Sequence, residues 1–325
     1  MTASRPRHGT VTLVTLALAL TLTACSSGGA EKDNSPSAGT GSGTHTVKTA
    51  MGDVKVKDRP RRVVVLDTAE LDSAITLGVR PVGATRAGAA SAFLSYLPKD
   101  RTTGITEVGE IANPSLEKIA ALKPDLILSN KVRDGGRYQQ LSAIAPTVLT
   151  ETTGYPWKQN FLVHADALGK KPQARTAVKK YEEHAAAVTE ALGGKKKAAD
   201  IGVNVVRFVE GADIRIYGKK NYIGTILADV GIGRPAITDK AKDGFSYDVS
   251  PEQIDKAAAD VIFTSTYGNP NKAKVTETTT SGLWRKLRAV RDGKVFQVDD
   301  ELWIQGIGYT AANQILGELE SDLAR

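Results

Sequence analysis

One cysteine and four histidines occur among the 325 residues, and this scarcity limits the chemistry open to the chain. A single cysteine excludes an internal disulfide. The histidines are scattered, and the sequence contains no C-x-x-C motif, no H-E-x-x-H motif and no acidic loop with the spacing of metal ligands. The sequence therefore predicts no metal bound directly by protein side chains.

Motifs of the common enzyme classes are also missing. The chain has no G-x-S-x-G nucleophile motif, no phosphate-binding P-loop and no dinucleotide fingerprint following a strand. The Gly231-x-Gly233 and Gly306-x-Gly308 pairs lack a third glycine. We therefore expect a protein that is not an enzyme and has no cofactor.

Charge gives little support for a nucleic-acid partner. The 43 Lys and Arg residues are balanced by 36 Asp and Glu residues, and the basic residues form no stripe interleaved with aromatics. The run Lys195-Lys196-Lys197 is typical of a solvated turn. No nucleic-acid binding is predicted.

The N-terminus carries an export signal. Arg5 and Arg7 precede an apolar run of 13 residues, 11–23, which is too short to span a membrane. The run ends in Leu-Thr-Ala-Cys25, which resembles a bacterial lipobox, whose cysteine takes a lipid and becomes the first mature residue. The alternative is an ordinary cleavage site followed by an unrelated cysteine. We predict a lipoprotein signal peptide (1–24) and a Ser/Gly/Thr-rich flexible tether (25–46). The expected location is the extracytoplasmic face of the cell membrane, with the lipid on Cys25 as the anchor.

Two similar segments flank a long helical pattern. Residues 114–130 and 250–266 share Glu, Ile and Asp at the same spacing, so that Glu117 matches Glu252. Each segment is typical of a short capped helix followed by a buried strand; in the second, Ser250 is the expected N-cap. Between them, 172–192 places apolar residues every three or four positions, as one face of a helix does. We predict an α/β fold with two similar lobes, 47–168 and 195–325, joined by one long α-helix at 169–194.

Several loops follow predicted strands and are candidate walls of one site. In open α/β sheets, ligands lie beyond the carboxyl ends of the strands. This places the loops at Arg86, at 130–133 and at 155–157 together. Arg207, near the end of a buried strand, is either a salt-bridged structural residue or lines the cleft.

The chain from about residue 47 to 325 resembles the periplasmic-binding-protein family of iron–siderophore and cobalamin uptake. The similarity is carried by the lipobox, the segment RVVVLDTAELDSAITLGVRPVG, the block PSLEKIAALKPDLIL, the long helix and the ending KVFQVDDELWIQGIGYTAANQIL. The resemblance implies a ligand cleft between the lobes, small hinge movements and a monomer that serves an ABC permease dimer. It also implies that Glu117 and Glu252 dock onto the permease; the alternative is that both only favour helix N-termini. A lipid-anchored adhesion or sensor protein on the same scaffold is a further alternative.

The residue types near the predicted cleft suggest the ligand. Arginine donates in a planar fork to chelating oxygens, while aromatic rings cover apolar linkers. A ferric hydroxamate siderophore of the ferrioxamine or coprogen kind fits this mixture, with the iron held by the siderophore; cobalamin, haem or a ferric catecholate are the alternatives. The predicted ligand-binding residues are Arg86, Lys131, Arg133, Tyr155, Trp157, Arg207, Tyr222, Tyr267 and Trp303.

Overall fold

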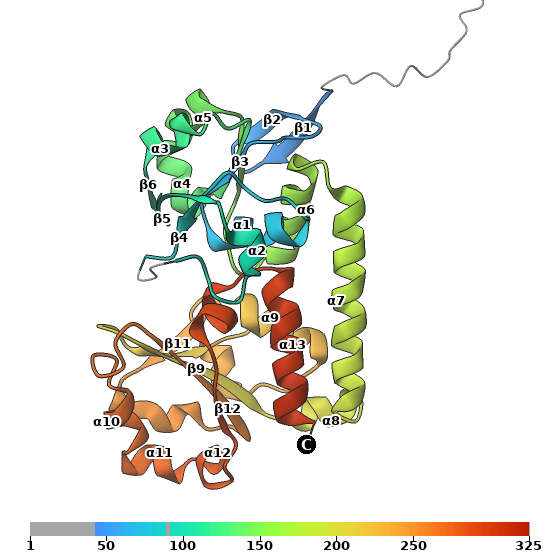
Figure 1. Ribbon diagram of the computed structural model, residues 1–325. Coiled ribbons are helices and arrows are strands. Elements are labelled where there is room, and N and C mark those ends of the chain that lie inside the picture. The colour runs from blue at the N-terminus through green and yellow to red at the C-terminus, as the bar shows by residue number, and fades with distance from the viewer. Residues whose placement is uncertain (1–42, 89–91, 325) are drawn as a thin grey trace, which may run out of the picture. The chain divides into compact units, whose positions relative to one another are not determined.

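The computed structural model describes residues 43–88 and 92–324, which form two α/β lobes with the long helix α7 (Lys171–Ala191) alongside them (Figure 1). The predicted signal peptide, Cys25 and most of the predicted tether lie outside the described residues. A hairpin of β1 (Thr44–Thr49) and β2 (Gly52–Lys57) precedes the first lobe, so strand structure begins within the range predicted as tether. The imidazole of His45 lies 2.9 Å from both Asp58 Oδ1 and the carbonyl oxygen of Asp166, which ties this strand to the lobe.

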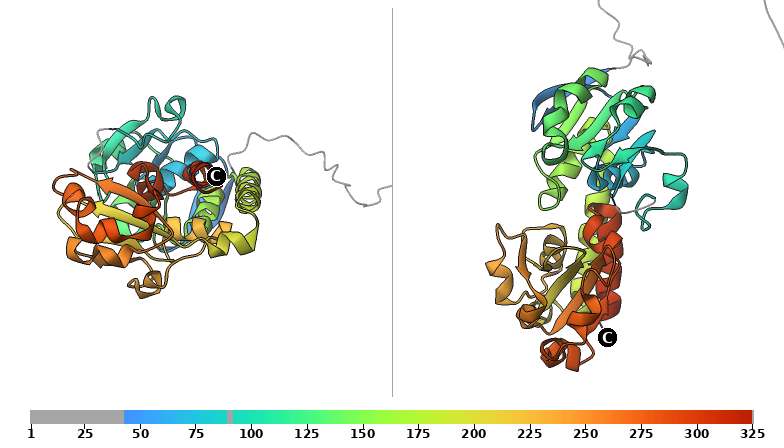
Figure 2. Two further views of the ribbon diagram at one scale, coloured as in Figure 1. Left: turned by 90° about the horizontal axis from the view of Figure 1, so that it is seen from below. Right: turned by 90° about the vertical axis from the view of Figure 1, so that its left-hand side faces the viewer.

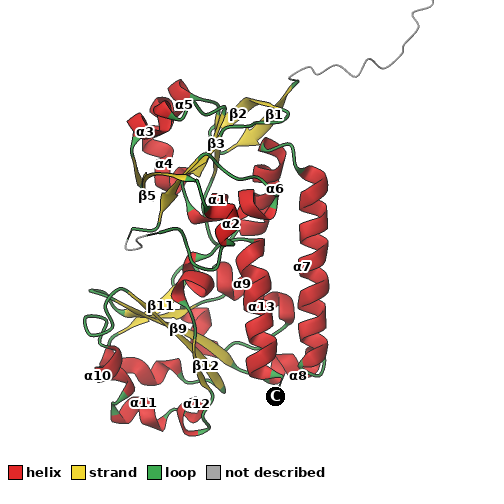
Figure 3. Ribbon diagram, viewed as in Figure 1, coloured by secondary structure: helices red, strands yellow, loops and turns green. Residues whose placement is uncertain are grey.

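The N-terminal lobe is built on a six-stranded sheet with the order β6-β5-β4-β3-β7-β8, in which only β6 is antiparallel to its neighbour. Figure 3 shows helices on both sides of these strands. The strands are β3 (Val63–Val65), β4 (Gly83–Arg86), β5 (Thr106–Glu110), β6 (Asn113–Pro114), β7 (Leu126–Asn130) and β8 (Thr147–Thr150). The helices are α1 (Thr68–Thr76), α2 (Lys99–Thr102), α3 (Leu116–Ala121), α4 (Lys131–Asp134), the 3₁₀ turn η1 (Gly135–Arg137), α5 (Tyr138–Ile144) and α6 (Trp157–Ala167).

The C-terminal lobe has a five-stranded sheet with the order β11-β10-β9-β12-β13, in which β9, β12 and β13 are parallel. The strands are β9 (Val203–Val209), β10 (Ile214–Tyr217), β11 (Ser246–Val249), β12 (Val261–Tyr267) and β13 (Val295–Gln297). The helices are α8 (Lys195–Asp200), α9 (Tyr222–Val230), α10 (Val275–Thr279), α11 (Gly282–Lys286), α12 (Arg288–Arg291) and α13 (Tyr309–Leu323), with short 3₁₀ or π turns η2 (Ala236–Lys240), η3 (Pro251–Ala257) and η4 (Glu301–Gln305).

The repeated segments differ in detail. In the first, the Ser115 hydroxyl caps α3 by accepting a hydrogen bond from the backbone N–H of Lys118. In the second, η3 is a 3₁₀ helix and the side chain of Ser250 makes no capping bond to the backbone. Ser250 therefore holds the predicted N-cap position, but its hydroxyl hydrogen-bonds the Glu252 side chain and does not cap the backbone. The lobes share layers of helix and sheet, as predicted, but the N-terminal sheet has one more strand, and β10 runs antiparallel to β9 whereas β4 runs parallel to β3.

One apolar core continues from lobe to lobe along α7. Successive residues of a strand face opposite sides of its sheet, so Val63 and Val65 of β3 join the shared core while Val64 joins a separate cluster. In the second lobe Val205 of β9 belongs to the shared core and Val206 to another cluster. Helix α7 buries Ala174, Tyr181, Ala185 and Val188 on one face, and α13, red in Figure 2, packs against it. Helix α7 therefore joins the lobes, as predicted, and α13 packs along it and against α1 of the N-terminal lobe.

Candidate ligand-binding cleft

A cavity of about 680 Å³ lies between the two lobes, within the usual size range of ligand pockets. Its wall in the N-terminal lobe follows the ends of β3, β4, β5, β7 and β8, and consists of Asp67, Thr68, Ala87, Gly88, Ile111, Arg133 and residues 152–155. Its wall in the C-terminal lobe consists of Arg207, Arg215, Tyr217, Lys220, Asn221, Tyr222, Ile223, Phe245, Tyr267, Trp303, Ile304, Gln305 and Ile307. In the N-terminal lobe the cavity therefore lies beyond the carboxyl ends of the parallel strands, where open α/β sheets bind ligands.

Arg207 lies at the centre of the C-terminal wall. Its Nε and Nη2 donate to the two carboxylate oxygens of Asp300 at 2.7 and 2.5 Å, and its guanidinium carbon lies 4.7 Å from the ring centroid of Tyr267. Burial alone would lower the pKa of Arg207, but the hydrogen bonds and charge of Asp300 outweigh it and raise the pKa. Arg207 is thus both salt-bridged and part of the cleft wall, so the two alternatives drawn from the sequence are both correct.

Arg133 is the arginine of the opposite wall. The buried carboxylate of Asp67 accepts a hydrogen bond from Arg133 Nε at 3.0 Å and another from Asn130 Nδ2 at 3.0 Å. Asp67 also caps α1 by accepting from the backbone N–H of Thr68. The Arg133 side chain is 38% exposed, and its two terminal nitrogens form no hydrogen bond with any residue that the structure describes.

Two buried ionisable groups lie behind Asp67. Burial, reinforced by the nearby charge of Asp67, raises the pKa of Glu70 to about 8, and burial lowers the pKa of His164 to about 3. Nε2 of His164 lies 3.6 Å from Oε1 of Glu70. Because both shifts favour the neutral forms near pH 7, we treat this contact as one between neutral groups rather than an ion pair.

The aromatic lining includes both accessible and covered rings. Tyr155 and Phe245 are 52% and 46% exposed and come from opposite lobes. Trp303 is buried, 4.6 Å from the ring of Phe263, and its Nε1 donates to Glu318. Tyr222 donates to the carbonyl oxygen of Gly308 at 2.7 Å. The accessible rings at the edge are therefore the ones placed to cover apolar parts of a ligand.

Six of the nine residues predicted to bind ligand line the cavity: Arg133, Tyr155, Arg207, Tyr222, Tyr267 and Trp303. The other three do not. Arg86 is the last residue of β4 and pairs with Glu107 and Glu110 of the adjacent strand, while Lys131 pairs with Glu151.

Trp157 does not line the cavity. It lies where the two lobes pack against each other, in a region that we call the hinge. Its ring is 2% exposed and packs 4.7 to 5.7 Å from the rings of Tyr309, Tyr222 and Tyr181, and its Nε1 donates to Thr225 of the other lobe. It is the first residue of α6, so the helix turns its ring away from the loop that precedes it.

Sequence reasoning missed two cations of the cleft, Arg215 and Lys220. Arg215 alternates with the buried Ile214 and Ile216 in β10, so it points to the opposite side of the strand. Lys220 directly precedes Asn221, whose side chain caps α9. The alternation around Arg215 was the signal that the sequence offered for this residue.

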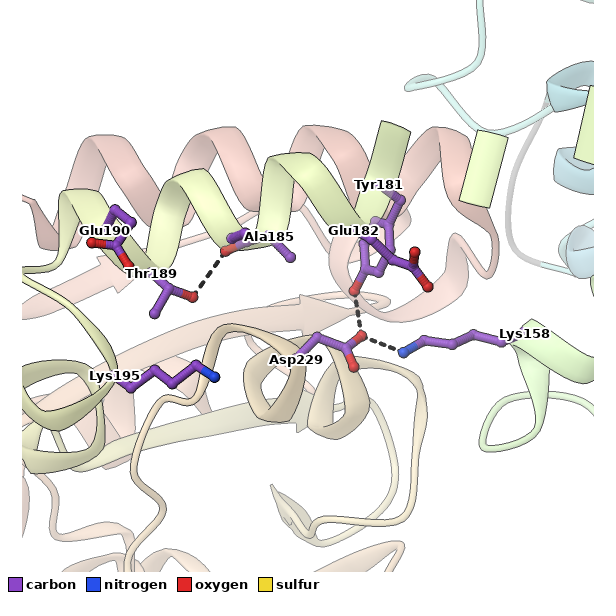
Figure 4. Close-up of a pocket in the computed structure, with 9 residues that line it drawn as sticks. Lys158, Tyr181, Glu182, Ala185, Thr189, Glu190, Lys195 and Asp229 are labelled. Carbon is purple, nitrogen blue, oxygen red and sulfur yellow. Dashed lines mark hydrogen bonds and ion pairs between the residues drawn. The ribbon is translucent and has the colours of Figure 1, made fainter. Parts of the chain in front are cut away.

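A smaller hollow of about 320 Å³ lies beside α7 and is a weaker candidate (Figure 4). There Asp229 accepts hydrogen bonds from Tyr181 and Lys158. The polar groups of these three side chains are therefore paired with one another and are not available to a ligand. The larger cleft instead presents Arg215 and Lys220, whose side chains form no ion pair with any described residue, which makes it the better ligand site.

The two predicted docking residues are exposed on short helical turns. Glu117 lies in the first turn of α3 and accepts a hydrogen bond from Ser115, while Glu252 lies in η3. A hydrogen bond from Ser250 lowers the pKa of Glu252. Helix α3 lies on the side of its lobe away from α7, and η3 packs on α10 and α11, which also lie away from α7 (Figure 1).

No helix within residues 43–88 and 92–324 has the length and apolar character needed to cross a membrane.

Comparison with solved structures finds similarity to Staphylococcus aureus SirA complexed with staphyloferrin B, with 34% identity, a TM-score of 0.78 and coverage of 86% of this chain and 98% of SirA. Among curated proteins, "Probable siderophore-binding lipoprotein YfiY" of Bacillus subtilis is 36% identical, covering 86% of this chain and 87% of that protein. The Fe(3+)-citrate-binding protein YfmC of the same organism is 30% identical over 82% of each chain.

These relatives are binding proteins, which confirms the expectation that the chain is not an enzyme. The family model described as "Periplasmic binding protein" matches residues 63–302. The two lobes, the connecting helix and this match together show that the chain belongs to the periplasmic-binding-protein family, as the sequence resemblance predicts.

Proposed function

We propose that the protein captures a ferric siderophore in the cleft and delivers it to an ABC permease. The cations of the cleft wall are the observation that carries this proposal, because ferric chelates present partly charged oxygen atoms. Within the described residues no group of three His, Cys, Asp or Glu side chains is placed to hold a metal ion. This supports iron arriving inside its chelator.

The charge of the cleft favours an anionic complex. Four cations, Arg133, Arg207, Arg215 and Lys220, line the cavity, against Asp67 as the one acidic residue among its described lining residues. An excess of positive charge in a partly enclosed cleft attracts anions. We therefore propose a siderophore that keeps ionised carboxylates, and the similarity to SirA complexed with staphyloferrin B supports this class.

A ferric hydroxamate is the second candidate. Six aromatic side chains line the same cavity, and three of them, Tyr155, Tyr267 and Phe245, are not buried. Such rings suit aliphatic spacers between hydroxamate groups. The Iron(3+)-hydroxamate-binding protein FhuD of Bacillus subtilis is 29% identical to this chain.

A titration of intrinsic tryptophan fluorescence separates these candidates, because Trp303 lies in the cavity wall. Ferric staphyloferrin B, ferric citrate, ferrioxamine B, a ferric catecholate, cobalamin and haem are the probes. We expect saturable quenching by the carboxylate complexes at the lowest concentrations, with calorimetry as a check against optical absorption by iron. Quenching by cobalamin or haem alone would contradict the proposal, and tighter binding of ferrioxamine B would favour the hydroxamate.

We also propose that Glu117 and Glu252 dock onto the permease and that lipid on Cys25 holds the protein, as a monomer, at the extracytoplasmic face of the membrane. The exposure of both carboxylates, one on each lobe and both on elements away from α7, supports docking. In cells, the double variant Glu117→Ala/Glu252→Ala should abolish siderophore-dependent iron uptake and leave affinity in solution unchanged. Glu183→Ala, which changes an exposed glutamate on α7, is the matched control.

The proposed lipid anchor has its own test: Cys25→Ala should release the protein from membranes.

A further inference from the structure

The arginines of the two cleft walls share one feature. Each donates its Nε to a buried aspartate: Arg133 to Asp67 at 3.0 Å and Arg207 to Asp300 at 2.7 Å. Asp67 is 2% exposed and Asp300 is 9% exposed. Arg133 lies in α4, which follows β7, whereas Arg207 lies in β9, so the two arginines do not occupy equivalent places in the two lobes.

Both aspartates are fixed by further hydrogen bonds. Asp67 accepts from the backbone N–H of Thr68 and from Asn130 Nδ2. Asp300 accepts from Ser265 Oγ at 3.0 Å and from Gln305 Nε2 at 2.9 Å. A carboxylate held by several donors has little freedom, so it can fix the plane of a guanidinium that binds it.

We propose that Asp67 and Asp300 are positioning residues, each of which orients one arginine toward the anionic groups of the ligand. The inference rests on the proposed siderophore-binding function. Asp67 takes the Nε of Arg133, and Asp300 takes the Nε and Nη2 of Arg207, so each aspartate fixes one edge of a guanidinium and leaves the other edge for the ligand. A preorganised donor loses less side-chain entropy on binding, so the affinity for an anionic ligand rises.

The sign of the effect separates positioning from simple charge. Each aspartate adds negative charge near the cleft, so its removal alone would strengthen the binding of an anion. Loss of positioning weakens that binding instead. Because the two effects have opposite signs, an Asp→Asn substitution decides between them.

The experiment measures the affinity of Asp67→Asn and Asp300→Asn for ferric staphyloferrin B and ferric citrate by calorimetry at two salt concentrations. Asp299→Asn, which changes the neighbouring exposed residue whose side chain accepts from the backbone N–H of Glu301, is the matched control. We expect affinity to fall about ten-fold in each positioning variant, as for the loss of one charge-assisted hydrogen bond, and to stay within about two-fold in the control. Tighter or unchanged binding in both variants would overturn the inference.

A second readout does not depend on the ligand. In protein labelled with ¹⁵N-arginine, the Nε–H resonances of Arg133 and Arg207 should exchange slowly with solvent, and each should lose this protection only in the variant of its own aspartate. If Asp300→Asn does not fold, Asp67→Asn still tests the proposal, because Asn retains the cap of α1 and Arg133 is partly solvated. Rapid exchange of both resonances in the wild-type protein would contradict positioning. Protected resonances in a wild-type protein that binds no ferric complex would contradict the proposed function while leaving the orienting contacts in place.

Discussion

Aromatic rings and charged groups occur together in two regions, the hinge and the cleft. The hinge comprises Asp72 with Tyr96 and Thr310, Asp229 with Tyr181 and Lys158, and the ring cluster around Trp157. There both aspartates have partners: Asp72 accepts from the backbone N–H groups of Thr310 and Ala311 and from Tyr96 and Thr76, and Asp229 accepts from Tyr181 and Lys158. In the cleft, the side chains of Arg215 and Lys220 form no hydrogen bond or ion pair with a described residue, and the guanidinium of Arg215 lies over the ring of Phe245.

The same residue types therefore serve stability in the hinge and ligand binding in the cleft. A buried polar group that is fully satisfied stabilises one arrangement of the lobes, whereas an unsatisfied donor at a solvated wall adds little to stability and is available for a ligand. Substitutions in the hinge should mainly change the free energy of unfolding. Substitutions in the cleft should mainly change the dissociation constant. Each prediction below tests this separation.

The largest effect is expected for Asp72→Ala. This buried carboxylate of α1 caps the first turn of α13, so its removal leaves several buried donors without a partner. We expect the free energy of unfolding in urea to fall by about 3 to 5 kcal/mol. Asp213→Ala, at an exposed position, should change it by less than about 0.5 kcal/mol. A loss of less than about 1 kcal/mol for Asp72→Ala would mean that solvent or other groups replace the cap.

A pH dependence is expected from Glu70 and His164, at the boundary between the cleft and the core. The pKa of Glu70 rises from 4.5 to about 8 on folding, so the folded state binds an extra proton between these values and stability falls as pH rises through them. The pKa of His164 falls from 6.5 to about 3, so the unfolded state binds the extra proton and stability rises from pH 3 to 6.5. The two slopes oppose each other between pH 4.5 and 6.5.

Glu70→Gln isolates the first of these contributions. Wild-type stability should fall by about 2 kcal/mol between pH 6.5 and 8, where only the Glu70 slope remains of the two. The variant should lose most of that fall. Urea unfolding at half-unit steps of pH measures it, and Glu107→Gln, on an exposed strand position, is the control. Parallel pH profiles for the wild type and Glu70→Gln would show that Glu70 ionises normally.

Arg215→Ala is expected to affect the cleft alone. We expect affinity for an anionic ferric complex to fall about ten-fold, equivalent to about 1.4 kcal/mol, with the unfolding free energy unchanged within about 0.5 kcal/mol. Arg207→Ala should lower both quantities, because it leaves the buried Asp300 without its cation. Calorimetry and urea unfolding on the same samples measure the two. Equal stability losses for both arginine variants would break the comparison between hinge and cleft.

Local patterns predicted much of the fold. The connecting helix was predicted at 169–194, and α7 spans Lys171–Ala191; the first repeated segment is a capped helix, α3, followed by the buried strand β7, as predicted. Alternation, helical periodicity and capping residues are properties of neighbouring residues, so they are readable from sequence. The same reasoning placed the cavity at loops after strands, because the carboxyl ends of parallel strands meet at one edge of a sheet.

Individual side chains were harder to assign, because their partners come from distant parts of the chain. Arg86 follows a strand, as a ligand residue would, but in the structure it forms ion pairs with Glu107 and Glu110 of the neighbouring strand. Trp157 follows a turn, but residues of α9 and α13 cover its ring. A single sequence gives the position of a loop, whereas the register of neighbouring strands and the packing of later helices decide which side chains face the cavity.

The smallest effect is expected for Trp157→Phe, which tests whether this residue belongs to the hinge. The substitution removes the hydrogen bond from Nε1 to Thr225 Oγ1 at 2.8 Å and keeps an aromatic ring among Tyr181, Tyr222 and Tyr309. We expect the free energy of unfolding to fall by about 1 kcal/mol, with a coupling to Thr225→Val of similar size in a double-mutant cycle. Affinity should stay within about two-fold, because the indole lies outside the cavity wall. A larger loss of affinity than of stability would contradict this expectation. It would assign Trp157 to the ligand site, as its position in the sequence suggests.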